Sequence, residues 1–573
     1  MSKGGKRVLV IVGILVAVLV AVGSMLRMSS QPARGSVLEL VLDNDVPDDV
    51  PVDGLAQLFG GRKLTMRDYL EALRLARDDG RIRGLLVVIN GPGIGSARLQ
   101  ELRDAILDFR KGGKWAVAYL ETAGEFSPGN RDYYLATACD TIWLAPSGDI
   151  NLVGVYAEVP FLRGTLDLLG IVPDMDHIGK YKSAMNTITD KAMNEAYRES
   201  MEALIGGIYG QVQKDIARAR KMTDEQVASI IDNGPYVGPK AVEASLVDKL
   251  GYRDELEENL KGKNGGALPL VKVGKYLKAG RYYTGGPKIA LIYGLGGVAR
   301  GDNDLDPLSG ETTMGSDTTA AAIKHAREDS SIKAIVFRVD SPGGSYIASD
   351  LIYREVMLAK HAKPVVVSMG DVAGSGGYFV AMGANKIVAE PATITASIGV
   401  LAGKLVTTGF WNKIGITFDA VQRGRHATFF STGRAYTPEE RVIFQSWLQR
   451  IYQDFVEKAA QGRGKTYDEI HAIAQGRVWT GEDALRLGLI DELGGLTAAI
   501  RRAQELANLD PESRVQLVVL PEGKSFFDRF WSGFDEARAP VASLQRHLRK
   551  LIEEGPSTGP EGVLSMPFVP VLR

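Results

Sequence analysis

The stretch DTIWLAP at Asp140–Pro146 returns 245 residues later as NKIVAEP at Asn385–Pro391. The same offset of 245 relates LVGV at Leu152–Val155 to SIGV at Ser397–Val400. With 573 residues, the chain also exceeds the ~250–300 residues at which a single hydrophobic core stops growing. A constant offset in a chain of this length predicts two homologous domains in tandem.

Each copy alternates continuous apolar runs with amphipathic stretches, and glycine-rich turns join them. Continuous apolar runs are typical of buried parallel strands, and the amphipathic stretches are typical of helices that cover a sheet. This order predicts an α/β fold with mainly parallel strands and right-handed crossovers. The expected strands are 37–42, 84–89, 115–120, 289–293, 332–339 and 364–369, and the expected helices are 66–78, 97–110 and 347–360.

Changes in composition predict where the parts of the chain begin and end. A Gly- and Lys-rich stretch is expected to connect the two repeats, 301–316 is expected to be an exposed loop, and the aperiodic residues from 555 onward are expected to be a mobile tail. The expected parts are a basic flank 1–7, an apolar run 8–26, a linker 27–35, a first repeat 36–260, a connection 261–286, a second repeat 287–510 and a C-terminal extension 511–573.

The amino-terminal segment has the composition of a membrane anchor. Lys3, Lys6 and Arg7 precede Val8–Leu26, a run of 19 residues without a charged side chain. A helix of that length reaches about 28 Å, close to the ~30 Å of a bilayer's hydrocarbon core. The basic flank predicts that the rest of the chain lies outside the cytoplasm. A cleaved signal peptide, with a weak cleavage site at Ala21–Gly23, is the alternative.

Composition excludes several classes of function. The net charge of −1 offers no broad basic field, so we expect no nucleic-acid partner. Cys139 is the single cysteine and lies in an apolar run, so intramolecular disulfides and Cys-rich metal sites are excluded. The six histidines lack metal-ligand spacing, and we expect no metal or cofactor.

The first candidate for chemistry is Ser375, in the glycine-rich stretch Gly374–Tyr378. It follows an apolar strand and opens a helix-like run, which is where open α/β folds expose functional side chains. The N–H groups of a helix N-terminus can stabilise an oxyanion. The competing interpretation is a serine that merely caps the helix.

The repeat offset supplies a partner for this serine. Ser375 corresponds to Asn130 in the first copy, and Lys182 of the first copy corresponds to Ala427 in the second. A serine becomes a nucleophile when a base takes its proton, and a neutral lysine can serve as that base. Such a lysine has to be buried or lie beside another cation, whereas most lysines are solvated.

A second glycine turn, Asp340–Gly344, also follows a buried strand. Its freed backbone suggests that the N–H groups of Gly344 and Gly376 form an oxyanion hole, although the turn could equally be a tight strand-to-helix connection. His426, the second-copy counterpart of Tyr181, is a reserve candidate for the base.

Four motifs together resemble the signal peptide peptidase A family in its long, duplicated and membrane-anchored form. They are Ser341–Gly344, Ala373–Tyr378, Ser397–Val400 and Tyr181–Ala184. The resemblance runs from the amino-terminal apolar run to about residue 506. Gly374 stands where family members often carry alanine.

The resemblance implies a role for each candidate residue. Ser375 would be the nucleophile and Lys182 the general base of a Ser–Lys serine protease. Gly344 and Gly376 would be the oxyanion donors, and Ser397 would orient the lysine.

The resemblance also implies the setting of the protease. Each half would be a ClpP/crotonase-like domain, and the chain would form a homotetramer. The chain would be anchored in the bacterial inner membrane through residues 8–26, with its body in the periplasm, and would degrade remnant signal peptides and other short apolar peptides. Two alternatives remain, namely a crotonase-type acyl-transfer enzyme and a catalytically silent membrane scaffold.

Overall fold

The computed structural model describes residues 32–43, 45–49, 63–280, 285–305, 312–521 and 563–566. The expected basic flank, the expected anchor at 8–26 and the first part of the linker lie outside these ranges. Within the described ranges, no helix combines the length and the apolar character that crossing a membrane requires.

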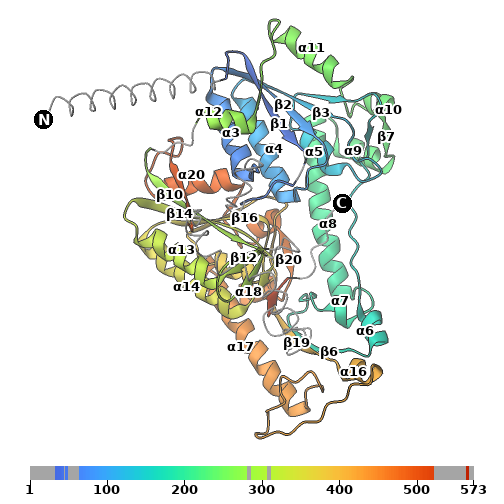
Figure 1. Ribbon diagram of the computed structural model, residues 1–573, viewed down its shortest axis with the longest axis vertical. Helices are drawn as coiled ribbons and strands as arrows, with labels where there is room; N and C mark the ends of the chain where they lie inside the picture. Colours follow the sequence, from blue (N-terminus) through green and yellow to red (C-terminus); the bar gives the residue numbers. More distant parts are fainter. Residues whose placement is uncertain are drawn as a thin grey trace, which may run out of the picture.

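The first repeat is built on a six-stranded parallel sheet with the order β8-β4-β3-β2-β1-β9. Helices α3, α4 and α5 follow strands β1, β2 and β3 (Figure 1). The strands are β1 Ser36–Leu42, β2 Ile82–Ile89, β3 Trp115–Leu120, β4 Thr141–Leu144, β8 Lys249–Leu250 and β9 Leu270–Lys272. The helices are α3 Met66–Asp78, α4 Ser96–Lys111, α5 Asn130–Ala136, α8 Glu195–Arg220, α9 Asp224–Asp232, α10 Gly238–Glu243, α11 Arg253–Lys263 and α12 Val273–Gly280.

The second repeat has the same parallel strand path, with the order β21-β17-β16-β14-β10-β22. It adds two strands: β18 pairs parallel with β16, and β20 pairs antiparallel with β18. Its strands are β10 Lys288–Leu295, β14 Ile332–Ser341, β16 Val365–Gly374, β17 Lys386–Ala389, β18 Ile394–Ala396, β20 Val478–Thr480, β21 Glu492–Leu493 and β22 Gln516–Leu520. Its helices are α13 Ser316–Glu328, α14 Tyr346–Ala362, α15 Gly376–Ala381, α17 Pro438–Arg463, α18 Tyr467–Ile473, α19 Gly481–Arg486 and α20 Leu496–Leu506. The matching strand orders confirm the predicted α/β duplication.

The two repeats share a hydrophobic core. Apolar side chains of α3 and α4 from the first repeat pack in one cluster with side chains of β10, β14 and α20 from the second. Leu73 and Leu102 on one side, and Leu291, Val336 and Ala499 on the other, are all buried there. This continuous core fixes the second sheet against the helices of the first repeat.

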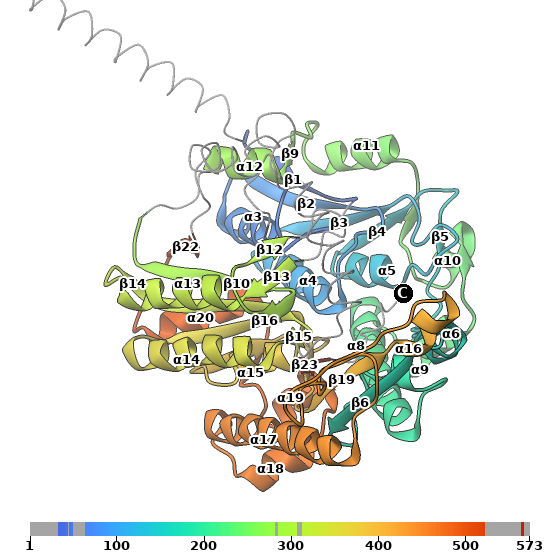
Figure 2. The same cartoon turned by 60° about the horizontal axis from the view of Figure 1, so that its bottom comes forward.

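A two-stranded ribbon joins the repeats at a second place. Strand β6, Val172–Ile178, comes from the first repeat and pairs antiparallel with β19, Val400–Val406, from the second. The ribbon lies beside short helices α6, Arg163–Leu169, and α16, Thr408–Lys413, away from both main sheets (Figures 1 and 2). Helix α7, Asn186–Thr189, and the segment that carries Lys182 follow from β6.

A small third sheet, with the order β12-β13-β11-β15-β23, corrects two expectations. Its strands are β11 Gly297–Ala299, β12 Asp304–Leu305, β13 Thr312–Gly315, β15 Gly343–Gly344 and β23 Leu564–Ser565. The segment 301–316 was expected to be a loop, but its described residues include β12, β13 and the start of α13 because their backbone groups pair with one another and with β11. The described part of the expected mobile tail forms β23.

The expected connection 261–286 also has more structure than its composition suggests. Leu270–Lys272 pairs with β1 and extends the first sheet, and α12 follows it directly. The apolar residues Leu270 and Val271 supply the strand, whereas the surrounding glycines and lysines dominate the composition.

Candidate active site

Ser375 is held on a strained turn between a strand and a helix. Strand β16 ends at Gly374 and helix α15 begins at Gly376, so Ser375 occupies the one position between them, with φ 52° and ψ −110°. Residues with a side chain rarely adopt positive φ, and such strain costs ~1–3 kcal/mol. The Ser375 side chain makes no capping hydrogen bond to the helix. The interpretation of Ser375 as a simple helix cap is therefore wrong.

The structure brings Lys182 to this serine. Lys182 Nζ lies 2.9 Å from Ser375 Oγ, although the two residues belong to different repeats. It also lies 3.1 Å from Ser397 Oγ and 3.2 Å from the Ser397 carbonyl oxygen. The three residues are buried, and Lys182 itself is 1% exposed. The interpretation of Lys182 as a solvated loop lysine is therefore wrong, whereas its neighbour Lys180 has a side chain that is 59% exposed.

Burial lowers the pKa of Lys182 well below its ordinary value. The cause is loss of hydration, which disfavours the charged ammonium more than the neutral amine. A lower pKa increases the fraction of the lysine that carries a free lone pair at a given pH. The arrangement can therefore remove a proton from a hydroxyl in contact with it.

Two glycines leave room for the lysine stem. A Cβ on Gly476 would lie 2.5 Å from Lys182 N, and a Cβ on Gly399 would lie 3.1 Å from Lys182 Cδ. Gly476 also has φ 81° and donates its N–H to the Ile398 carbonyl at 2.7 Å. Gly476 was not predicted from the sequence. Its only sequence signal is its position just before the strand Val478–Thr480.

Gly344 and Gly376 lie next to each other beside the serine. A Cβ on Gly376 would lie 3.0 Å from Gly344 N, and a Cβ on Gly343 would lie 2.6 Å from Gly376 N. Gly344 is held in strand β15, and Gly376 is the first residue of α15. The two backbone amides therefore line one small space, which side chains at positions 343 and 376 would fill.

Polar contacts between the two repeats hold the strand that leads into the Ser375 turn. Asp371, four residues before Ser375, accepts hydrogen bonds from the N–H groups of Ala97 and Arg98 at 2.9 and 3.0 Å, at the start of α4. It also pairs with the Arg98 guanidinium. Because Asp371 belongs to strand β16, which ends directly before Ser375, this contact fixes the serine relative to the first repeat. Sequence reasoning did not identify Asp371.

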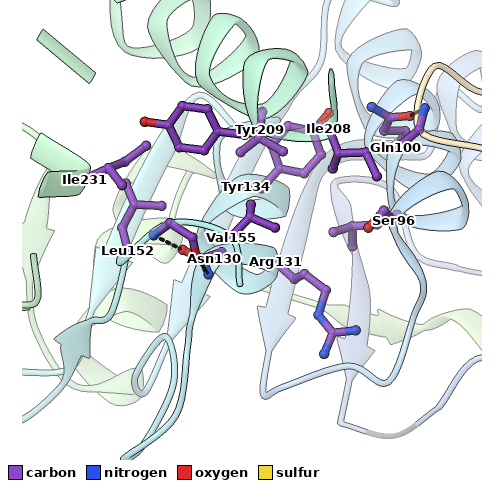
Figure 3. Close-up of a pocket in the computed structure, with 14 residues that line it drawn as sticks. Ser96, Gln100, Asn130, Arg131, Tyr134, Leu152, Val155, Ile208, Tyr209 and Ile231 are labelled. Atoms are coloured by element: carbon purple, nitrogen blue, oxygen red, sulfur yellow. Dashed lines mark hydrogen bonds between the residues drawn. The ribbon is translucent and has the colours of Figure 1, made fainter. Parts of the chain in front are cut away.

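The corresponding place in the first repeat has a different chemistry (Figure 3). Asn130 stands where the second repeat has Ser375, and it borders a mostly apolar pocket lined also by Tyr134, Leu152 and Ile208. Its carboxamide accepts from Gly154 N at 3.2 Å and donates to the Gly154 carbonyl at 2.8 Å. Both heteroatoms of Asn130 are therefore used to hold a loop.

The reserve candidate His426 lies elsewhere. Its side chain is 40% exposed and lies 3.9 Å from Glu440. Lys182 takes the position beside Ser375, so His426 is not the base in this geometry. Among the residues that the structure describes, no three His, Cys, Asp or Glu side chains converge in a way that would hold a metal ion.

The duplicated α/β fold, with a serine on a strained turn beside a buried lysine, defines a serine hydrolase. The sequence pattern of Peptidase family S49 matches residues 111–265 and 357–510, which together make up more than half of the chain. The chain belongs to this family and is a serine peptidase, so the resemblance to signal peptide peptidase A is confirmed.

Relatives that match this chain over most of its length support this assignment. The chain is 35% identical to the chloroplastic serine protease SPPA of Arabidopsis thaliana, over 91% of this chain and 76% of that protein. It is 33% identical to Protease 4 of Salmonella typhi, over 87% of this chain and 82% of that protein. It is 30% identical to Protease 4 of Haemophilus influenzae, over 81% and 77% respectively.

Proposed function

We propose that the chain cleaves peptide bonds with a Ser–Lys dyad, in which Ser375 is the nucleophile and Lys182 the general base. The observation that carries this proposal is the 2.9 Å contact between Lys182 Nζ and Ser375 Oγ in a buried site. A neutral amine has two N–H bonds and one lone pair. With its N–H bonds directed to the hydroxyl and carbonyl of Ser397, its lone pair faces the Ser375 hydroxyl.

The reaction follows from these contacts. Lys182 takes the Ser375 proton as Oγ attacks the carbonyl carbon of the scissile peptide, and the carbonyl oxygen becomes an oxyanion. The N–H groups of Gly344 and Gly376 stabilise that oxyanion, and each such donor contributes ~3–4 kcal/mol in comparable hydrolases. The protonated lysine then gives its proton to the leaving amine. Water, activated by the same lysine, hydrolyses the acyl-enzyme.

The substrates would be short, largely apolar peptides such as remnant signal peptides. In this proposal residues 8–26 anchor the chain in a bacterial inner membrane, its body lies in the periplasm, and each repeat is a ClpP/crotonase-like domain. Assembly as a homotetramer is supported by apolar side chains exposed around the β6–β19 ribbon, where a second copy would cover them. They are Leu168, Val172, Ile414, Ile416, Phe418 and Val421.

A serine-directed fluorophosphonate and a fluorogenic apolar peptide test the dyad. We expect Ser375→Ala to abolish both labelling and cleavage, and Lys182→Ala to reduce both by at least a thousandfold while the fold is retained. Lys180→Ala is the matched control, because that lysine lies two residues away and is solvated. Full turnover in either dyad variant would remove that residue from its role.

The same assay separates the remaining alternatives. A membrane scaffold would show no labelling at Ser375. A crotonase-type enzyme would label but would consume a thioester and leave the peptide intact.

A further inference from the structure

A segment of the chain itself lies against the proposed catalytic groups. Residues Val563–Met566, called here the docked segment, form β23 and pair antiparallel with β15, with Gly344 opposite Leu564 (Figure 2). Met566 N donates to the Pro342 carbonyl at 2.9 Å. On the other side, Leu401 N donates to the Val563 carbonyl at 3.0 Å. The docked segment therefore bridges two backbone edges of the second repeat.

One carbonyl of the docked segment lies beside the proposed oxyanion donors. A Cβ on Gly343 would lie 2.0 Å from the Leu564 carbonyl oxygen and 2.6 Å from Gly376 N. The Leu564 oxygen and the Gly376 N–H thus lie against the same face of Gly343. This is the small space that the two proposed oxyanion donors line.

The side chains of the docked segment occupy apolar sites on both repeats. Leu564 is fully buried, and Met566 is 6% exposed. Met566 lies directly on Gly374, because a Cβ there would be 1.5 Å from its Sδ. It also packs with Leu204 and Ile208 of α8 from the first repeat. Alternate residues of an extended strand point to the same face, so Leu564 and Met566 share one side of the segment.

Addition of a strand to an exposed backbone edge is a general mode of peptide recognition. Main-chain hydrogen bonds supply affinity, and pockets for alternate side chains supply specificity. A strand that only stabilised the fold could lie on any edge of either sheet. The docked segment instead pairs with Gly343 and Gly344. It also covers Gly374, the residue directly before Ser375.

We propose that the docked segment occupies the place of the peptide substrate and makes the chain its own competitive inhibitor. This inference rests on the proposed peptidase function and adds a substrate class to it. The site takes an extended peptide that pairs antiparallel with Pro342–Gly344. It selects medium-sized apolar side chains at two alternate positions, those filled here by Leu564 and Met566.

The test uses the full chain with Leu564→Asp and Met566→Asp together. Their carboxylates oppose burial in apolar sites, so the docked segment is released. We expect KM for a fluorogenic apolar peptide to fall about tenfold with kcat unchanged. This is the change expected if the docked segment leaves the wild-type site free for about a tenth of the time. Leu506→Asp is the matched control, because it makes the same change on the exposed end of α20 and leaves KM unchanged.

A binding measurement separates this inference from the peptidase proposal. A fluorescein-labelled peptide with the sequence of residues 560–570 is titrated into the released variant carrying Ser375→Ala, with a scrambled peptide as control. Saturable binding of the native sequence alone, displaced by the apolar substrate peptide, supports the inference even where no variant cleaves peptides. An unchanged KM in the released variant, or equal binding of the scrambled peptide, overturns it. Absence of cleavage in every variant counts against the peptidase proposal only.

Discussion

The active site depends on the docking of two repeats, and one buried ion pair offers a direct way to weaken that docking. Arg338 of β14 is fully buried and lies 2.8 Å from Glu101 of α4 and 3.1 Å from Asp48, both in the first repeat. Removal of one partner of a buried pair costs ~3–5 kcal/mol, because the other charge is left without compensation. Asp48 remains in Glu101→Gln, so the cost is at the low end, about 3 kcal/mol.

Urea titration measures this cost. For an unfolding slope of about 3 kcal/mol/M, the loss lowers the urea midpoint of peptidase activity by about 1 M. Midpoints of activity and of far-ultraviolet circular dichroism are compared directly, because two repeats need not unfold in one step. Activity should be lost before helical content, since undocking separates Lys182 from Ser375 while each sheet persists.

The matched control for this prediction is Glu71→Gln on α3. Glu71 pairs with Arg74 at 2.8 Å, but the pair is partly solvated, and such pairs contribute ~0–1 kcal/mol. A triple variant, Asp48→Leu and Glu101→Leu with Arg338→Met, replaces all three buried charges by apolar side chains and should recover most of the loss. If Glu101→Gln shifts the midpoint no further than Glu71→Gln does, the ion pair does not hold the repeats together.

Four other predictions address the site. Ser397→Ala removes a partner of the amine and should lower kcat at least tenfold, measured by steady-state kinetics beside Ser446→Ala, a change on an exposed helix face. Because the pKa of Lys182 is lowered in the fold, kcat/KM should rise with pH along a limb below the ordinary lysine value of ~10.4. Between the lowered pKa of folded Lys182 and the ordinary value of ~10.4, the unfolded chain binds a proton on this lysine that the folded chain does not. The stability of the wild type relative to Lys182→Met, measured by thermal unfolding, should therefore fall as pH drops through this range and stay constant below it. A stability difference that does not change with pH contradicts a buried neutral amine. Gly344→Ala should abolish labelling by fluorophosphonate, because its Cβ would lie 2.2 Å from the Val298 carbonyl and the strand would have to shift; retained labelling contradicts a role for that backbone position.

Much of the fold could be predicted because the determining signals are local. The expected helix 66–78 matches α3 residue for residue, and its boundaries come from a Thr65 cap and an apolar periodicity. The expected strand 115–120 matches β3, since a continuous apolar run between turns has few other uses. The repeat offset then identified the pair, because Ser375 corresponds to Asn130 in the first repeat and Lys182 corresponds to Ala427 in the second.

Other features depend on contacts that no local pattern encodes. Asp371 is one acidic residue among many until α4 of the other repeat presents its N-terminus to it. Gly476 matters because the Lys182 stem passes against it, 294 residues away in sequence. The docked segment has four residues of mixed character, and its strand form comes from the edge it meets at Gly343–Gly344.

The two-stranded ribbon explains why one site can exist where duplication would allow two. Residues 417–423 of the second repeat correspond to β6, and residues 155–161 of the first correspond to β19, yet neither segment forms a strand. Each repeat therefore keeps the half of the ribbon that its partner has lost, and β6 delivers Lys182 to the other repeat's serine. At the position that corresponds to Ser375, the first repeat has Asn130, whose carboxamide is bound to its own loop, in place of a hydroxyl for a base to act on. A lysine at position 427 would have no chemistry to support, which accounts for the alanine there in physical terms.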